Sequence, residues 1–396
     1  MEDIINPILR PPSISINTYS ENRAHQLADM IIIDLSFVAI VQYSLIIQAV
    51  YTMSVFWTTL LFSTTPLFDL SFHSTDALAF SPPQLQLPNF FKPATELKST
   101  TFSYTHLEGN GQLWQATTKR NTQASIVIDP IASQLDFGIP NLYRANKNIL
   151  SERQTIDLIC DANPSHCLLT MGLDDHTHLP TLEQLQARMP ELQYVIAPSC
   201  EQKLLEFGLN SDFITVLDHG EVCTLAEGAT VTATEGALVG PPWQKRENGY
   251  ILELNHSNRN NNISEDGLSI YYEPHADVIL NNISKLRADI MISPVTKQSL
   301  PAQVPSVGQY TLVYGGETTL QIAEILGARV LVPLGNGALD VDGPLAGLVA
   351  AEGDASDFER LVEGRNVGRP EGDDYYMRVA IATPGVPLTV DCIGLI

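Results

Sequence analysis

The chain has 396 residues, of which 44% are hydrophobic and 17% charged, a composition that suits one large or two medium domains with a proper core. Its formal net charge of -23, with no basic patch, repels long polyanions, so nucleic acid is not an expected partner. The five cysteines are scattered and form no C-x-x-C pair, which argues against a disulfide scaffold or a thiolate zinc site and predicts free, mostly buried thiols.

A long apolar segment lies near the N-terminus. From Leu35 to Phe62 there is no charged residue, and the segment is long enough to span a bilayer. Two alternatives remain open: a single anchoring helix, or a cleaved presequence that begins functionally at Met53. Membrane contact is expected only through this segment.

A short motif follows the apolar segment. Residues Ala77 to Pro82 read Ala-Leu-Ala-Phe-Ser-Pro, which resembles the Ala-x-Ala-Phe-x-Pro motif that directs proteins into the plastids of algae with secondary plastids. It implies cleavage after Ala79 and a plastid location, with membrane anchoring as the alternative. We therefore expect residues 1–98 to be a targeting or hydrophobic segment with a linker, and residues 99–396 to form the folded domain.

Short strands are expected at the start of the domain. Apolar runs over Phe102–Leu107 and Ala124–Asp129 predict strands, and Gly109-Asn110-Gly111 is typical of a turn between strands. Asp129-Pro130 ends the second strand. Thr181 is expected to cap a helix.

Helices interleave with strands in the rest of the domain. Val195-Ile196 predicts a buried strand and Glu201–Phe207 a helix. Tyr310–Tyr314 predicts a strand, Glu317–Leu326 a helix that Gly327 ends, and Arg329–Pro333 another strand. This order of elements favours two sheets sandwiched between helices.

Metal-ligand residue types are concentrated after one apolar strand. Leu168-Leu169 is followed by Asp174, Asp175, His176 and His178 within a short loop. Zinc and similar divalent ions prefer imidazole nitrogen and carboxylate oxygen, and a loop at a strand end lets neighbouring side chains converge on one ion. A solvated polar loop with a helix-capping aspartate is the alternative.

A second set of donors follows another strand. Leu268–Tyr272 predicts an apolar strand, and Glu273 and His275 come directly after it. Histidines without such neighbours, among them His106 and His219, are interpreted as ordinary surface or satisfied polar residues. The two strand ends together predict one site.

These motifs resemble the metallo-β-lactamase superfamily, especially its lactonase- and phosphodiesterase-like branch, from about Thr101 to Val390. The opening Leu107-Glu108-Gly109-Asn110 and the run Ile126–Pro130 are similar to the first strands of that family. The loop Thr170–His176 stands where the family has Thr-His-x-His-x-Asp-His. The resemblance implies an α+β fold, a four-layer αββα sandwich, and a divalent metal.

The sequence departs from the family at four histidine positions. Met171 and Leu173 replace the first two, Ala237 stands at the histidine of Thr-Pro-Gly-His, and Gly335 replaces the last one. His275 stands where the bridging aspartate is expected. A methionine, a leucine and an alanine cannot hold a hard dication, so the ordinary two-metal mechanism is not expected.

A single metal ion is the resulting hypothesis. Asp175, His176, His178 and His275 are expected to hold one zinc ion, with iron or manganese as alternatives, and to leave a position for water. Asp174 or Glu273 is expected to act as general base. The segment from Ala237 to Trp243 is expected to form a wall of the substrate cavity, with core packing as the alternative role of Trp243.

Three functions compete at this point. The first is a hydrolase of an ester, lactone or phosphodiester that acts on a small-molecule substrate through this reduced site. The second is a non-catalytic protein of the same fold that binds a ligand or partner. The third, a nuclease, is disfavoured by the negative charge and the missing histidine pairs.

Overall fold

The computed structural model describes residues 100–391, except for gaps at 120–121, 138–141, 227, 240–242, 256–266, 301–309, 337, 345, 371–372 and 374. The predicted targeting segment, residues 1–98, lies outside the described residues, so its role and the domain boundary stay predictions. Within the described residues no helix is long and apolar enough to cross a membrane. The four described cysteines are free, and two of them are buried.

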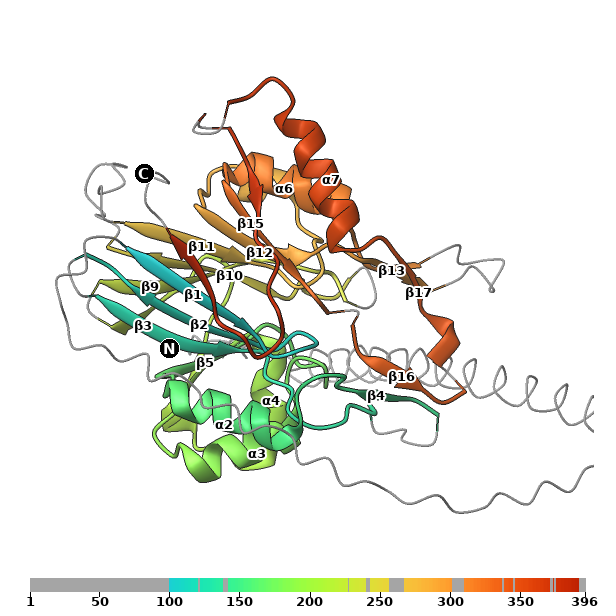
Figure 1. Ribbon diagram of the computed structural model, residues 1–396. Coiled ribbons are helices and arrows are strands. Elements are labelled where there is room, and N and C mark those ends of the chain that lie inside the picture. The colour runs from blue at the N-terminus through green and yellow to red at the C-terminus, as the bar shows by residue number, and fades with distance from the viewer. Residues whose placement is uncertain are drawn as a thin grey trace, which may run out of the picture. The chain divides into compact units, whose positions relative to one another are not determined.

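Two large mixed sheets form the middle of the molecule (Figure 1). The first sheet has the strand order β19-β1-β2-β3-β5-β6-β7, with antiparallel pairing up to β3 and parallel pairing from β3 to β7. Its strands in that order are β19 (Leu388–Asp391), β1 (Thr101–His106), β2 (Gln112–Thr117), β3 (Gln123–Ile128), β5 (His166–Leu169), β6 (Gln193–Ile196) and β7 (Ile214–Val216).

The second sheet repeats this plan. Its order is β18-β15-β12-β11-β10-β9-β8, parallel from β18 to β11 and antiparallel from β11 to β8. Its strands in that order are β18 (Arg378–Val379), β15 (Val330–Leu334), β12 (Ile290–Pro294), β11 (Leu268–Tyr272), β10 (Asn248–Leu254), β9 (Ala229–Glu235) and β8 (Val222–Ala226).

Helices cover the outer face of each sheet (Figure 1). The first sheet packs against α2 (Glu152–Ala162), α3 (Leu179–Arg188) and α4 (Pro198–Phe207). The second packs against α5 (Leu280–Ile283), α6 (Gly316–Leu326) and α7 (Ala355–Asn366). The protein is therefore the four-layer αββα sandwich that the resemblance implies.

Smaller elements lie at the edge of the sandwich. They are the sheet β14 (Tyr310–Val313), β13 (Lys297–Leu300) and β17 (Ala350–Glu352), the pair β16 (Asp340–Asp342) and β4 (Arg144–Asn146), and the 3-10 helices Ser211–Phe213 and Ala346–Leu348.

The central core lies between the two sheets. Trp114 of β2 contacts Phe102 of β1 and Tyr272 of β11 edge to face, with ring centroids 5.8 and 6.2 Å apart. All three rings are fully buried. Burial of aromatic rings of this size contributes much of the stability of a core, and here it fixes the first sheet against the second. The ends of β3, β5 and β11 are thereby held at a fixed spacing.

Most predicted elements are present at nearly the expected places. The predicted strand Leu268–Tyr272 is β11, and Glu317–Leu326 falls within α6, which ends at Gly327 in the left-handed conformation with φ +70°. The expected helix cap at Thr181 is wrong. The helix begins at Leu179, and the Thr181 hydroxyl instead accepts a hydrogen bond from the backbone N–H of Ala132.

Candidate active site

Asp129 is the acceptor around which the two sheets meet. It follows β3, and its carboxylate accepts hydrogen bonds from the backbone N–H of Thr170 at 2.9 Å, the Thr170 hydroxyl at 2.6 Å and Nδ1 of His176 at 2.8 Å. The Tyr272 hydroxyl, at the end of β11 in the other sheet, donates to it at 3.1 Å. Since all four residues are fully buried, this network joins the two strand ends rigidly.

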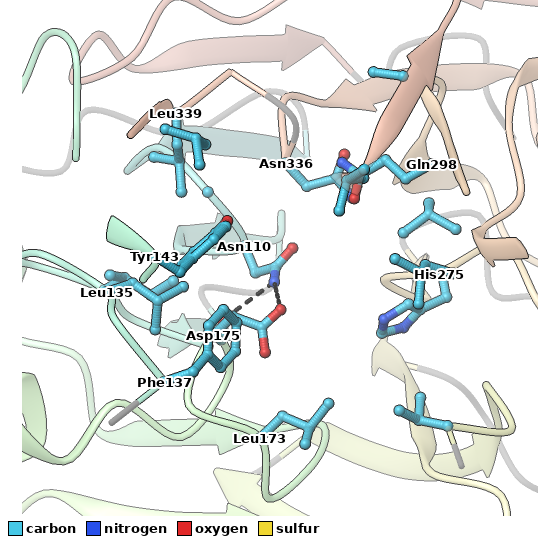
Figure 2. Close-up of a pocket in the computed structure, with 18 of the residues that line it drawn as sticks. Asn110, Leu135, Phe137, Tyr143, Leu173, Asp175, His275, Gln298, Asn336 and Leu339 are labelled. Carbon is cyan, nitrogen blue, oxygen red and sulfur yellow. Dashed lines mark hydrogen bonds between the residues drawn. The ribbon is translucent and has the colours of Figure 1, made fainter. Parts of the chain in front are cut away.

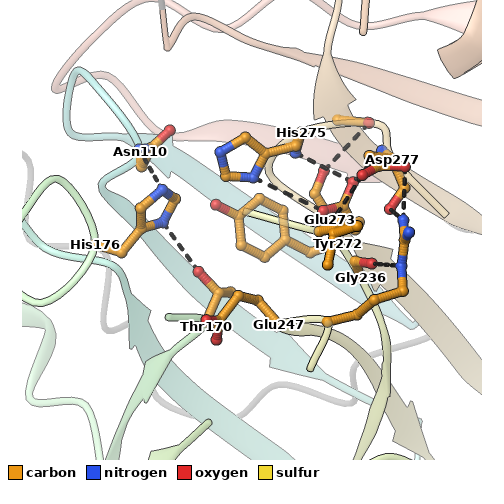
Figure 3. A network of polar contacts seen from close by, with 12 residues as sticks. Asn110, Thr170, His176, Gly236, Glu247, Tyr272, Glu273, His275 and Asp277 are labelled. Carbon is orange, nitrogen blue, oxygen red and sulfur yellow. Dashed lines mark hydrogen bonds and ion pairs between the residues drawn. The ribbon is translucent and has the colours of Figure 1, made fainter. Parts of the chain in front are cut away.

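His176 is held on both sides of its ring (Figure 3). Nδ1 faces Asp129, and Nε2 lies 3.1 Å from Nδ2 of Asn110 and 3.5 Å from Oδ2 of Asp175. Burial alone lowers the pKa of His176, but the carboxylates of Asp175 and Asp129 outweigh it and raise the pKa to about 9. Each protonation state has a partner: the neutral ring accepts from Asn110, and the protonated ring donates to Asp175.

His275 faces His176 from the second sheet. The two ring centroids are 5.4 Å apart, and His275 is 8% exposed. Its Nδ1 lies 3.9 Å from Oε1 of Glu273, and neither atom has a hydrogen-bond partner among the described residues. Burial raises the pKa of Glu273 to about 8, while burial and the charge of His176 lower the pKa of His275 to about 3. Both groups of this pair are therefore neutral near pH 7.

The loop after β11 is fixed by Glu273 itself. Oε2 of Glu273 accepts the backbone N–H groups of His275 at 3.1 Å and Asp277 at 3.0 Å. Asp277 in turn binds Arg246 at 2.6 Å. These contacts fix the backbone that carries His275, and Oε1 of Glu273 lies behind its ring, 3.9 Å from Nδ1.

A cavity of about 370 Å³ opens beside these residues (Figure 2). Its polar side chains include Asn110, Asp175, His275, Gln298 and Asn336, and most of the remaining wall is aliphatic or aromatic. Oδ1 atoms of Asn110, Asp175 and Asn336 are buried and have no hydrogen-bond partner among the described residues. None of the described lining residues is Lys or Arg.

The structure brings together three of the four residues expected to hold a metal. Asp175 and His275 line this cavity, and the buried His176 lies next to both, with Nε2 3.5 Å from Asp175 and its ring centroid 5.4 Å from that of His275. His178 does not join them, because it precedes α3 and its Nδ1 pairs with the Thr181 hydroxyl at 2.8 Å. The four-ligand arrangement is therefore not formed among the described residues.

The two expected general bases have different places. Asp174 is bound to Lys203 at 2.6 Å, and neither residue lines the cavity. Lys203 also donates to the carbonyl of Gly172 at 3.0 Å, so this ion pair ties down the loop after β5. Glu273 is close to the site but lies behind His275. The catalytic role of either carboxyl stays a prediction.

The four positions that lack the family histidines have new neighbours. Met171 and Ala237 are buried, and Leu173 lines the cavity with 43% exposure. A Cβ atom at Gly335 would lie 2.8 Å from Cε1 of His106. His106 is buried and donates to the carbonyl of Gly109 at 3.2 Å, in agreement with its interpretation as a satisfied polar residue.

The expected cavity wall is only partly confirmed. Leu238 and Val239 line the cavity, and Asp277 accepts the backbone N–H of Leu238 at 2.9 Å. Trp243 does not line it and is 69% exposed, so neither the wall nor the core contains this ring.

The donor set does not fit a metal ion in this arrangement. Among the residues described, no group of three His, Cys, Asp or Glu side chains is placed to hold one. Nδ2 of Asn110 lies directly in front of Nε2 of His176. A ligating imidazole must also lose its proton, and the nearby carboxylates raise the pKa of His176. We therefore derive no chemical step through a metal.

Several residues of the site were not recognised from the sequence. The sequence places Asn110 in a turn and Asp129 at a strand end, within motifs that resemble the family, and predicts no site role for either. Their role depends on His176, which lies 66 positions after Asn110 and 47 after Asp129. The one local signal is that Asp129 has φ +43°, a backbone strain that a side chain with several partners can stabilise.

Comparisons with known proteins agree with this architecture. A family model described as a beta-lactamase superfamily domain matches residues 114–335. No curated protein matches the chain. Among solved structures, the metallo hydrolase Igni18 from Ignicoccus hospitalis is 15% identical with a TM-score of 0.46, covering 73% of this chain and 98% of its own.

Two further solved structures are similarly distant. The metallo-beta-lactamase fold protein YhfI from Bacillus subtilis is 12% identical, with a TM-score of 0.44 and coverage of 74% of this chain and 100% of its own. Zn(2+)-bound PqqB from Methylobacterium extorquens is 16% identical, with a TM-score of 0.38 and coverage of 74% and 99%.

The fold and the site define a class of protein: an αββα sandwich with a polar site where the strand ends of its two sheets meet. Because the family model covers more than half of the chain, this protein belongs to the beta-lactamase superfamily.

Proposed function

We propose that this chain hydrolyses an ester or lactone bond in a small, uncharged and largely apolar molecule. One observation carries the proposal. Buried Oδ1 atoms of Asn110 and Asp175 have no partner among the described residues, and they line the same largely apolar cavity as the His275 ring. A buried polar atom without a partner costs free energy unless a ligand or water satisfies it, so this end of the cavity suits a polar group of a bound molecule.

The charge of the cavity argues against phosphodiesters. Its described lining includes the carboxylate of Asp175 and no cation, and the whole chain carries a formal charge of -23. A phosphodiester anion would lose its hydration without gaining an opposite charge. An uncharged ester or lactone avoids this cost, and the apolar wall suits an acyl chain.

His275 is the group best placed to move a proton. Its Nδ1 lies on the side of Glu273, so Nε2 is on the opposite side of the ring (Figure 3). Burial and the charge of His176 keep His275 neutral with a pKa of about 3, so Nε2 acts as a weak base that accepts a proton from water as the water oxygen attacks the carbonyl carbon. The same proton then passes to the leaving alkoxide. Glu273 fixes the backbone of the loop that carries this ring.

The sequence suggests a different mechanism for the same hydrolysis, in which one zinc, iron or manganese ion activates the attacking water. Because the donor set does not fit an ion, we assign proton transfer to His275 instead. Metal dependence distinguishes the two forms. Activity that survives dialysis against a chelator supports His275, and activity that is lost and then restored by one added metal supports the single-ion form.

The test measures hydrolysis of acyl esters and lactones of increasing chain length by the full chain, with bis(p-nitrophenyl) phosphate as the charged comparison. We expect turnover of the uncharged substrates only, and a loss of about 100-fold or more in kcat for His275→Gln. His219→Gln is the matched control, because His219 contacts the carbonyl of Glu247 away from the cavity. Equal activity of both variants contradicts the proposal.

A non-catalytic ligand-binding role is the second candidate. It is favoured by the contacts of Asn110, whose amino group already bonds His176 and Asp175. Under this alternative, non-hydrolysable ketone analogues of the esters raise the thermal midpoint of the protein, while no ester is turned over. That pair of results would replace the hydrolase proposal.

We also propose that the N-terminal segment is a plastid-targeting presequence. The support is its uncharged run and the Ala-Leu-Ala-Phe-Ser-Pro motif. Intact-mass measurement of the protein from its native cell is expected to show a chain that starts after Ala79. A mass that still includes residues 35–62 supports the membrane anchor instead.

A further inference from the structure

The carboxamide of Asn110 lies between two groups that are typical metal ligands. Its Nδ2 is 3.1 Å from Nε2 of His176, 3.1 Å from the backbone oxygen of Asp175 and 3.5 Å from Oδ2 of Asp175 (Figures 2 and 3). An amide nitrogen donates and never accepts, so the two oxygens of Asp175 accept from it, and Nε2 of His176 accepts from it when the ring is neutral. A cation would be recognised by the same three atoms.

The support behind His176 is also of the kind found at metal centres. A ligating histidine commonly donates its second ring N–H to a carboxylate, which fixes the ring and its tautomer. Here Nδ1 of His176 donates to Asp129 at 2.8 Å, and Asp129 is itself held by Thr170 and Tyr272. The hydrogen bonds that would orient His176 as a ligand are therefore present, but Asn110 occupies the position in front of Nε2 where an ion would bind.

The place of Asn110 is set by its turn. Glu108 and Gly109 both have positive φ, +65° and +59°, and the turn is closed by a 2.8 Å bond from the N–H of Leu107 to the carbonyl of Gly111. Asn110 is 7% exposed. Such a buried turn leaves the side chain little freedom to move away from His176.

Glu108 adds a second fixation. Its carboxylate accepts the backbone N–H groups of Asn148, Ile149 and Leu150 at 2.7, 3.0 and 2.7 Å. The turn that presents Asn110 is thereby tied to the segment before α2. The position of the amide is thus part of the folded framework.

We infer that the amino group of Asn110 takes the place of a divalent ion between Asp175 and His176, so that the native chain needs no metal, and that exchanging this one group for oxygen creates a cation site. The inference concerns binding and does not depend on hydrolysis. Its failure is therefore distinguishable from failure of the proposed function.

The experiment compares the wild-type full chain with Asn110→Asp, which is nearly the same size and replaces the donor by a carboxylate oxygen. Each protein is dialysed against a chelator, and metal content and thermal midpoint are measured with added Zn²⁺ and Mn²⁺. We expect no retained metal and no shift for the wild type. For N110D we expect about one bound ion and a rise of about 5 °C at a metal concentration roughly 100 times Kd.

Asn336→Asp is the matched control, because Asn336 also faces the cavity and its buried Oδ1 bonds no described residue. It adds the same charge to the same cavity, and we expect no metal-dependent shift. An equal shift for N336D would show that any added charge suffices and would overturn the inference.

Two other results overturn it directly. One is a wild-type protein that retains about one equivalent of metal after dialysis. The other is a folded N110D protein, judged by circular dichroism, that binds metal no better than the wild type. If N110D does not fold, Asn110→Ala serves in its place: it vacates the same position, and Zn²⁺ is then expected to raise its thermal midpoint while leaving that of the wild type unchanged.

Discussion

Asp129→Ala tests whether the network beneath the site holds the two sheets together. The substitution removes the shared acceptor of Thr170, His176 and Tyr272, all of which are fully buried. The Thr170 hydroxyl oxygen lies 2.9 Å from Nδ1 of His176 and can accept from it, so the N–H and O–H of Thr170 and the O–H of Tyr272 are left without an acceptor. At roughly 1 to 3 kcal/mol for each, the loss is about 3 kcal/mol or more.

The same magnitude follows from a second consideration. Removing one partner of a buried ion pair typically costs about 3 to 5 kcal/mol. The measurement is equilibrium unfolding in urea, with the midpoint and the slope compared between variants. Tyr272→Phe removes only the 3.1 Å bond to Asp129, so a loss of about 1 to 2 kcal/mol is expected for it.

An exposed ion pair supplies the other control. Asp342 binds Arg144 at 2.8 Å with about half of each side chain exposed, and Asp342→Ala is expected to cost less than about 1 kcal/mol. If Asp129→Ala costs no more than Tyr272→Phe, the carboxylate is not the centre of the network and the reasoning is refuted.

Two further predictions concern the surroundings of the site. Folding raises the pKa of Glu273 to about 8 from its ordinary 4.5. Between these two pH values the native state holds a proton that the unfolded state has lost. The free energy of unfolding therefore falls as pH rises from about 5 to 8. Thermal unfolding across this range is expected to show a shallower decline for Glu273→Gln, and an unchanged slope would exclude Glu273 as the titrating group. Gly335→Ala is expected to lower the thermal midpoint by a few degrees, because overpacking against His106 costs roughly 1 to 3 kcal/mol. In the double variant with His106→Ala, most of that loss is expected to be relieved.

The sequence was sufficient to predict the elements that carry the site. Leu268–Tyr272 is a continuous apolar run bounded by polar residues, and it forms β11, buried at every position. Glu273 and His275 directly follow it, so their place at a strand end was predictable. The same holds for Asp175 and His176 after β5.

The partners of these residues could not be predicted in the same way. Tyr272 donates to Asp129 from 143 positions away, and the two meet only because Trp114 and its neighbours pack one sheet against the other. Periodicity identifies which residues of a strand are buried but carries no information on which loops face each other across a core. His178 shows the converse. It lies two residues from His176, yet α3 begins next to it and its ring turns toward Thr181.

The departures from the family pattern form one consistent set. At Gly335, where a histidine is expected, the adjacent space is occupied by the ring of His106, which stacks on Tyr104 with centroids 6.4 Å apart and an interplanar angle of 9°. In front of His176, the space beside Nε2 is occupied by Nδ2 of Asn110 at 3.1 Å. Neighbouring side chains thus take up the space at these two places, while the buried Oδ1 atoms of Asn110, Asp175 and Asn336 around the cavity have no partner among the described residues. A histidine restored at position 335 would therefore clash with His106, whereas a change at Asn110 acts directly on the position in front of Nε2 of His176.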